Sequence, residues 1–119
     1  MHAVALKRVY EPPAPEDGTR VLVDRLWPRG LSKEKAAVDH WAKEVAPSHA
    51  LRRWFGHAPE RWDAFQARYC EELESPEAQE EIAALRALQR KGHVTLLYAA
   101  KDEEMNNAVA LRDYLRRRH

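Results

Sequence analysis

The stretch VLVDRLWPRG, residues 21 to 30, decides the fold class of this chain. It begins with Val21, Leu22 and Val23, an apolar run without alternation, which is typical of a strand buried on both faces of a sheet covered by helices. We therefore expect a strand over residues 20–26. The WPRG that follows has Pro at the second position and Gly at the fourth, which predicts a type I turn over residues 27–30.

Two further apolar segments complete the predicted sheet. Residues 3–10 (AVALKRVY) alternate in part and are expected to form the first strand, and residues 94–99 (VTLLYA) form the clearest strand. The connection from the second strand to this last one is long and helical, as a parallel pairing requires. The Pro-rich link of residues 11–19 is short for such a crossover, so the relative orientation of the first two strands stays open.

Capping residues mark the expected helices. Ser32, Ser48 and Ser75 stand where a hydroxyl can cap a first turn, and Gly56 and Gly92 stand where a helix can end. The expected helices cover residues 32–45, 48–56, 59–73, 75–92 and a last segment that begins near Asp102. The sequence therefore predicts one α/β domain over residues 1–119, with a small, mostly parallel sheet of about three strands packed with four to five helices.

Composition excludes several classes of protein. The net charge of +1 indicates no strong overall field for a nucleic acid or a membrane. The single cysteine, Cys70, excludes an internal disulfide and suits a reducing compartment. No apolar run approaches the ~20 residues of a membrane span, and the first residues show no signal-peptide pattern. We expect a cytoplasmic protein with no membrane partner, and the oligomeric state stays open.

Polar residues follow two of the predicted strands at their carboxyl ends. These residues are Asp24, Arg25 and Arg29 at the carboxyl end of the second strand, and Lys101, Asp102, Asn106 and Asn107 at that of the last strand and the start of the following helix. In open α/β sheets, ligands bind in the crevice outside the carboxyl ends of the strands. If the strands are parallel neighbours, both polar sets lie in one crevice.

The residue types in these sets indicate an anionic ligand. Arg25 and Arg29 offer forked donors that suit phosphate or carboxylate. Asp24 is a candidate general base, and His57, on a loop between two helices, is the best histidine candidate for proton transfer. One residue of the Asn106–Asn107 pair is expected to reach into the crevice or to tie it to a neighbouring loop.

Each candidate also has a structural alternative. Asp24 would pair with an arginine, His57 would cap a helix or bond a carbonyl, and Asp102 would cap the last helix. His40 and Glu44 are four residues apart on a predicted helix, but two ligands do not make a zinc site. Because no metal-ligand spacing, Gly-rich phosphate loop or GxSxG elbow occurs, no metal is expected and the cofactor is unknown.

Several motifs together resemble the domain-of-unknown-function 488 family, in its small YeaO-like branch. They are RVYEPP, DGTRVLVDRLWPRG, WFGH followed by PERWDAFQARY, and VTLLYAAKDEEMNNAVAL, and they extend from about Lys7 to Leu115. The resemblance implies a compact single-domain α/β protein and assigns no activity. The polar motif positions that it marks are Arg8, Asp24, Arg25, Arg29, His57, Asp102 and Asn107. A thiol-based mechanism is not implied, because the cysteine-containing N-terminal motif of larger relatives is absent.

Two functions follow as alternatives. The first is binding, and conversion if the protein is an enzyme, of a phosphate- or nucleotide-containing small molecule. In this hypothesis the catalytic residues are Asp24 and His57, and the substrate-binding residues are Arg8, Arg25, Arg29, Lys101, Asp102 and Asn107. The second is a non-catalytic nucleic-acid-binding module of the transcription-regulator type, a label that some relatives carry. A third, plainer option is that the charged motifs only brace the fold.

Overall fold

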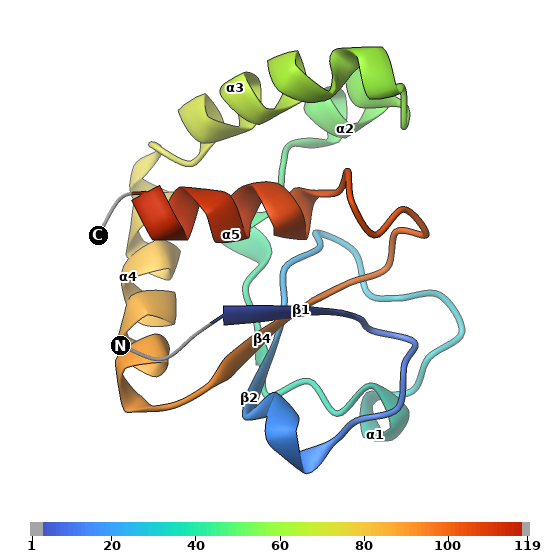
Figure 1. Ribbon diagram of the computed structural model, residues 1–119, viewed down its shortest axis with the longest axis vertical. Coiled ribbons are helices and arrows are strands. Elements are labelled where there is room, and N and C mark those ends of the chain that lie inside the picture. Colours follow the sequence, from blue (N-terminus) through green and yellow to red (C-terminus); the bar gives the residue numbers. More distant parts are fainter. Residues whose placement is uncertain (1–3, 118–119) are drawn as a thin grey trace.

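Four parallel strands form one sheet at the centre of the protein (Figure 1). The computed structural model describes residues 4–117, so Ala3 of the expected first strand lies outside the described residues. The strands are β1 (Val4–Arg8), β2 (Thr19–Leu22), β3 (His40–Trp41) and β4 (Val94–Tyr98). The predicted α/β class is confirmed, with one strand more than expected.

The last strand in the sequence occupies the middle of the sheet. The strand order is β1-β4-β2-β3, and every pairing is parallel. In the register, Leu96 of β4 lies beside Leu6 on one side and beside Val21 on the other. The orientation that the sequence left open is therefore explained: β1 and β2 are parallel but not adjacent, because β4 separates them.

The apolar run of β2 is buried on both faces of the sheet, as predicted. Val21 and Val23 belong to the large core beneath the helices, whereas Leu22 belongs to a smaller cluster with Val9 and Leu97 on the opposite face. Figure 1 shows α2 (His49–Phe55), α3 (Trp62–Glu72), α4 (Pro76–Lys91) and α5 (Asn107–Arg117) gathered on one side of the strands, with the short α1 (Lys33–Ala36) set apart from them. The sheet is thus covered on both faces.

The predicted helix caps are confirmed, and Gly92 ends α4 as expected. The Oγ of Ser48 accepts a hydrogen bond from the backbone N–H of Leu51, and the Oγ of Ser75 accepts one from Ala78. Gly56 ends α2 in the left-handed conformation, with a φ of 51°. The 3-10 turns η1 (Pro15–Asp17), η2 (Lys43–Val45) and η3 (Pro59–Arg61) complete the helical elements of the described chain.

The helix expected over residues 32–45 is wrong beyond its first turn. Ser32 caps α1 as predicted, but Ala37 takes a left-handed φ of 48° and ends the helix. The chain then extends into β3, where the N–H of Asp39 donates to the carbonyl of Arg20 and the N–H of Ala42 donates to that of Leu22. The edge of β2 offers backbone partners that a continuing helix would leave unpaired.

Two smaller predictions are also corrected. Asp102 does not cap the last helix; α5 begins at Asn107, and the Oδ1 of Asn106 accepts the hydrogen bond from Val109. The turn near WPRG lies one residue later than expected, because the N–H of Leu31 donates to the carbonyl of Pro28. Gly30 is then the third turn residue and has a φ of 76°, as a type II turn requires.

No helix within residues 4–117 is long and apolar enough to cross a membrane.

Candidate functional site

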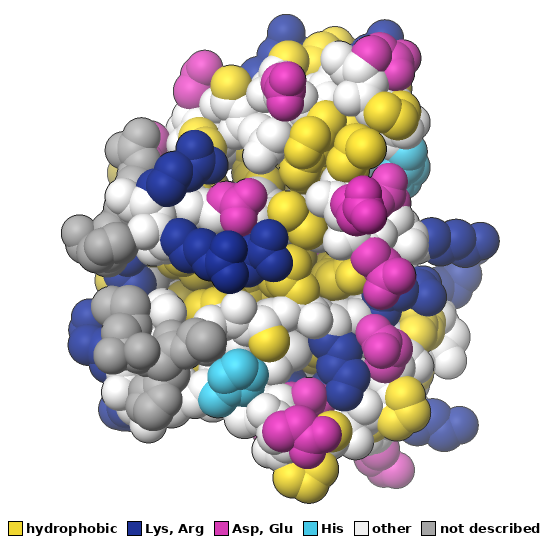
Figure 2. Space-filling view, viewed as in Figure 1, with side chains coloured by type: hydrophobic (Ala, Val, Ile, Leu, Met, Phe, Trp, Pro, Cys, Tyr) yellow, Lys and Arg dark blue, Asp and Glu magenta, His cyan; other side chains and the backbone are white. Residues whose placement is uncertain are grey.

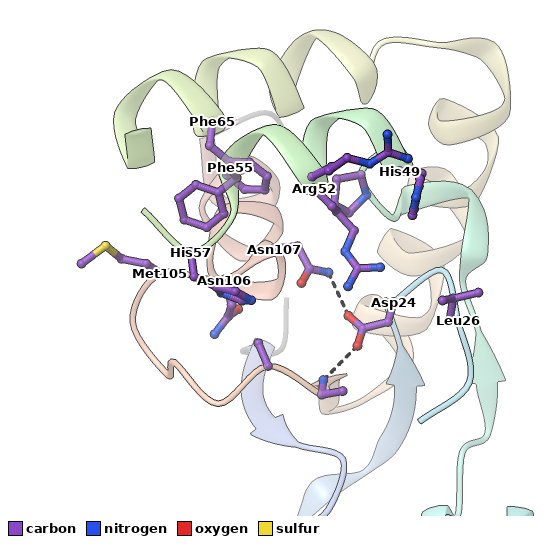
Figure 3. Close-up of a pocket in the computed structure, with 14 residues that line it drawn as sticks. Asp24, Leu26, His49, Arg52, Phe55, His57, Phe65, Met105, Asn106 and Asn107 are labelled. Carbon is purple, nitrogen blue, oxygen red and sulfur yellow. Dashed lines mark hydrogen bonds between the residues drawn. The ribbon is translucent and has the colours of Figure 1, made fainter. Parts of the chain in front are cut away.

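A cleft of about 480 Å³ opens at the carboxyl ends of β2 and β4 (Figure 3). Its walls come from the ends of these strands, from the residues that lead into α5, and from α2 with the adjacent loop and α3. The residues that line it include Asp24, Leu26, His49, Arg52, Arg53, Phe55, His57, Phe65, Ala99, Met105 and Asn107. Of the eight site residues predicted from the sequence, Asp24, His57 and Asn107 meet here.

Asp24 and Asn107 form the wall at the strand ends. The Oδ2 of Asp24 accepts a hydrogen bond of 2.9 Å from the backbone N–H of Ala99, and its Oδ1 accepts one of 3.2 Å from the Nδ2 of Asn107. The same Nδ2 also donates to the carbonyl of Val23 at 3.0 Å. Asn107 therefore ties the crevice to a neighbouring segment, as expected of one residue of the asparagine pair. Within residues 4–117, Asp24 has no hydrogen bond to an arginine.

The pKa of the half-buried Asp24 carboxyl is affected in opposite directions by burial and by its hydrogen-bond donors. Burial raises the pKa of Asp24 above its ordinary value, and the donors Ala99 and Asn107 and the charge of Arg52 counteract this increase only in part. This carboxyl group is therefore harder to ionise than an exposed aspartate.

A cationic face of α2 forms the opposite wall. His49, Arg52 and Arg53 are exposed and stand three and four residues apart, so they share one side of the helix. The other side of α2 buries Leu51 and Phe55 in the core. Within the described chain, neither guanidinium has a recorded hydrogen bond or ion pair. Figure 3 shows His49 and Arg52 projecting from α2 over the part of the cleft where Asp24 lies.

Sequence reasoning missed this cationic wall. The signal was present in the i, i+3, i+4 spacing of its three residues, but the caps of this segment do not reveal it. Which way the polar face would turn depends on how α2 packs.

Aromatic rings form the apolar part of the cleft. Phe55 and Phe65 are stacked with their ring centroids 4.6 Å apart, and Trp62 stacks on Phe65 at 5.6 Å. His57 lies on the loop after α2 with a φ of 58°, and its ring centroid is 6.1 Å from that of Phe55. Met105 adds a flexible apolar side chain opposite these rings.

The five other predicted site residues do not line the cleft. Arg8 donates from Nε to the carbonyl of Ala100 at 3.0 Å and from Nη2 to that of Ala99 at 3.1 Å, so it holds the loop after β4. Arg25 donates from Nη2 to the carbonyl of Ala46 at 3.1 Å. The side chains of Arg29 and Lys101 are exposed outside the cleft.

Asp102 holds a turn at the rim of the cleft rather than lining it. Its Oδ1 accepts hydrogen bonds of 2.9 Å from the backbone N–H groups of Met105 and Glu104. These bonds, followed by the charge of His57, lower the pKa of Asp102. The turn places Met105 against the cleft.

Residues 4–117 contain no group of three or more His, Cys, Asp or Glu side chains that could hold a metal ion. His40, expected on a helix with Glu44, lies in β3, and its Nε2 is 2.5 Å from the Oε1 of Glu81 on α4.

Comparison with known proteins identifies the family. A family model described as "Inactive DUF488-N3 subclade" matches residues 3–119. The chain belongs to this subclade of the DUF488 family. It is 42% identical over 113 residues to the uncharacterized protein YeaO of Escherichia coli strain K12, which covers 95% of this chain and 96% of that protein. It is 45% identical over 112 residues to the uncharacterized protein Rv3073c of Mycobacterium tuberculosis, which covers 94% of this chain and 92% of that protein.

The family resemblance expected from the sequence motifs is thus confirmed for this DUF488 protein. No solved structure is significantly similar to the chain.

Proposed function

We propose that this DUF488 protein binds an anionic ligand that also carries a flat ring, of the mononucleotide class, and holds it without converting it. The observation that carries this proposal is the pairing of a cationic wall with an aromatic floor in one cleft. Its volume of about 480 Å³ lies within the range of small-molecule sites.

The cationic wall supports binding of the anionic group. Arg52 and Arg53 are exposed and line the cleft, and neither guanidinium has a recorded hydrogen bond or ion pair within residues 4–117. A guanidinium can donate two parallel hydrogen bonds to a phosphate. His49, which also lines the cleft from α2, adds a ring N–H group beside these arginines.

The aromatic floor supports binding of the ring. Phe55 and Phe65 are themselves buried, but both reach the surface of the cleft. Flat rings gain contact area and favourable geometry from aromatic neighbours. Leu26, which is 66% exposed at the mouth of the cleft, gains an apolar contact when a ligand covers it.

Two observations support binding over catalysis. The subclade to which the chain belongs is described as inactive. In addition, both carboxylate oxygens of Asp24, the candidate base, already accept hydrogen bonds that join β2, β4 and α5. We assign Asp24 to the architecture of the binding wall and not to proton transfer.

The nucleic-acid alternative has less support. A transcription regulator of the winged-helix type needs an antiparallel hairpin, whereas all strand pairs of the described chain are parallel. Figure 2 shows acidic and basic side chains interspersed over the face in view, without a continuous basic surface. Binding of nucleic acid depends on such a surface.

The test is a calorimetric titration of the protein with AMP. The variant Arg52→Ala is expected to weaken binding about tenfold or more, since it removes charge-assisted hydrogen bonds. Arg90→Ala, which removes an exposed arginine on α4 outside the cleft, is the matched control and is expected to leave the affinity unchanged. Chromatography of the AMP after prolonged incubation is expected to recover it intact.

Three results would overturn the proposal: no binding of AMP at millimolar concentration, equal weakening by both variants, or conversion of AMP by the protein. Tighter binding of a short oligonucleotide than of AMP would favour the nucleic-acid alternative.

A further inference from the structure

We infer that the cleft selects nucleotides by the amino group of the base, because the side chains of Asp24 and Asn107 at the strand ends offer hydrogen-bond acceptors to a ligand and no free donor of their own. This inference rests on the proposed function and adds a specificity to it. Asp24 and Asn107 are the specificity-determining residues.

The orientation of the Asn107 amide is fixed by its partners. Its Nδ2 donates to the carbonyl of Val23 and to the Oδ1 of Asp24, and both of these groups are acceptors. A flipped amide would place its oxygen against two other oxygens, so the reverse orientation is excluded. The Oδ1 of Asn107 is therefore available to accept a hydrogen bond from a ligand, and it has no recorded hydrogen bond within residues 4–117.

Asp24 has acceptor capacity left as well. Each of its oxygens accepts one hydrogen bond, from Ala99 and from Asn107, whereas an ionised carboxylate has about four acceptor positions. The donors of Ala99 and Asn107 are already engaged: the N–H of Ala99 bonds to Asp24, and the Nδ2 of Asn107 bonds to Val23 and Asp24. A ligand edge that meets Asp24 and Asn107 pairs with them only through N–H or O–H donors of its own, such as the amino group of a base.

The two walls together orient the ligand. Arg52 and Arg53 of α2 line the same cleft and attract the phosphate, which leaves the base of a bound nucleotide to meet Asp24 and Asn107. A base without an amino group leaves these acceptors without a partner after water has been displaced, and this costs binding free energy.

The experiment compares two pairs of nucleotides that differ by one amino group. AMP is paired with purine riboside 5′-monophosphate, and GMP is paired with IMP, with all dissociation constants measured by calorimetry. The member with the amino group is expected to bind about tenfold more tightly in at least one pair. In the variant Asp24→Asn, which replaces one of the two acceptor oxygens with a donor NH2 group and removes the charge, this preference is expected to disappear.

The preference is a ratio measured on one preparation, so partial loss of folded protein in Asp24→Asn does not affect it. If that variant fails to fold, the comparison of the two nucleotide pairs in the wild-type protein still tests whether the amino group strengthens binding. Equal affinities within both pairs would overturn the selectivity while leaving nucleotide binding intact. If none of the four nucleotides binds, the proposed function and the selectivity are both overturned.

Discussion

Asn107 and Asp24 are 83 positions apart in the chain and are joined by a hydrogen bond of 3.2 Å from Nδ2 to Oδ1. The same amide reaches the carbonyl of Val23, and the carboxylate of Asp24 reaches the N–H of Ala99. One pair of side chains thus connects the end of β2, the end of β4 and the start of α5. The shape of the cleft depends on this connection.

Replacing Asn107 with Ala is expected to lower the free energy of unfolding by about 1–3 kcal/mol, because partly buried acceptors lose their donor. Urea denaturation at neutral pH measures the change. Gln66→Ala on α3 is the control, since this amide has no recorded hydrogen bond within residues 4–117, and its effect is expected to stay within about 0.5 kcal/mol. Equal effects of the two variants would show that the connection contributes nothing to stability.

Arg25, before the turn that follows β2, and Arg29, within that turn, are expected to differ in their effect on stability. Arg25→Ala removes hydrogen bonds to the carbonyls of Ala46 and Pro47 and is expected to cost about 1.5–3 kcal/mol. Arg29→Ala removes an exposed side chain and is expected to cost about 0.5 kcal/mol or less. Thermal unfolding of both variants checks this; a larger loss for Arg29→Ala would contradict the assignment of Arg25 as the bracing residue.

Acid is expected to destabilise the protein through Asp17. Burial by itself would raise the pKa of Asp17, but hydrogen bonds from Ala14, Arg20 and Lys7 outweigh it and hold the pKa below its ordinary value. A lowered folded-state pKa gives stability that is present above the unfolded value of about 3.9 and is lost as the pH falls through the folded value. Asp17→Asn is expected to cost roughly 3 kcal/mol at neutral pH, because Arg20 stays buried without its counter-charge.

Urea midpoints of the wild type and Asp17→Asn from about pH 7 to about pH 3 measure this dependence, and the two proteins are expected to converge in acid. Asp24→Asn is the control, because the stability contribution of Asp24 is expected to depend on pH in the opposite direction to that of Asp17. The folded-state pKa of Asp24 is raised. Its contribution to the free energy of unfolding is therefore largest in acid and is lost as the pH rises through the folded-state pKa. Parallel pH profiles for all three proteins would contradict both assignments.

Two glycines with positive φ provide a matched test of backbone packing. A Cβ at Gly18, whose φ is 64°, would lie 2.2 Å from the carbonyl oxygen of His93, whereas a Cβ at Gly30 would have no atom within 4 Å. Gly30→Ala is expected to lower the free energy of unfolding by about 1–2 kcal/mol, because alanine disfavours the left-handed conformation. Gly18→Ala is expected to cost clearly more, or to prevent folding, as circular dichroism and urea denaturation would show; similar costs would contradict the close approach to His93.

Local chemistry made much of the fold predictable. Ser48, Gly56 and Ser75 act through their own neighbouring backbone groups, so their capping roles could be inferred without knowledge of the rest of the chain. The apolar run from Val21 to Val23 likewise predicted a strand buried on both faces. The two-residue β3 could not be found in this way, because it is too short to show a period and is stabilised by its bonds to β2.

The candidate site was only partly predictable, because the partners of its charged residues are distant in the sequence. The sequence indicated that polar residues follow the strands, and Asp24, Asn107 and His57 do meet in the cleft. Arg8 and Arg25 were expected there for their charge, but their guanidinium groups are engaged with backbone carbonyls, and no motif reveals such partners.

The sequence by itself determined the elements whose signals are local: the caps, the buried strands and the carboxyl-end positions of Asp24 and Asn107. Only the tertiary structure decided that β4 lies between β1 and β2, because the order of strands depends on long-range packing and not on any neighbouring residue. It also decided that α2 buries Leu51 and Phe55 and so turns Arg52 toward the strand ends. A helix carries its polar and apolar faces in its sequence, but the direction of each face is fixed only by the core against which it packs.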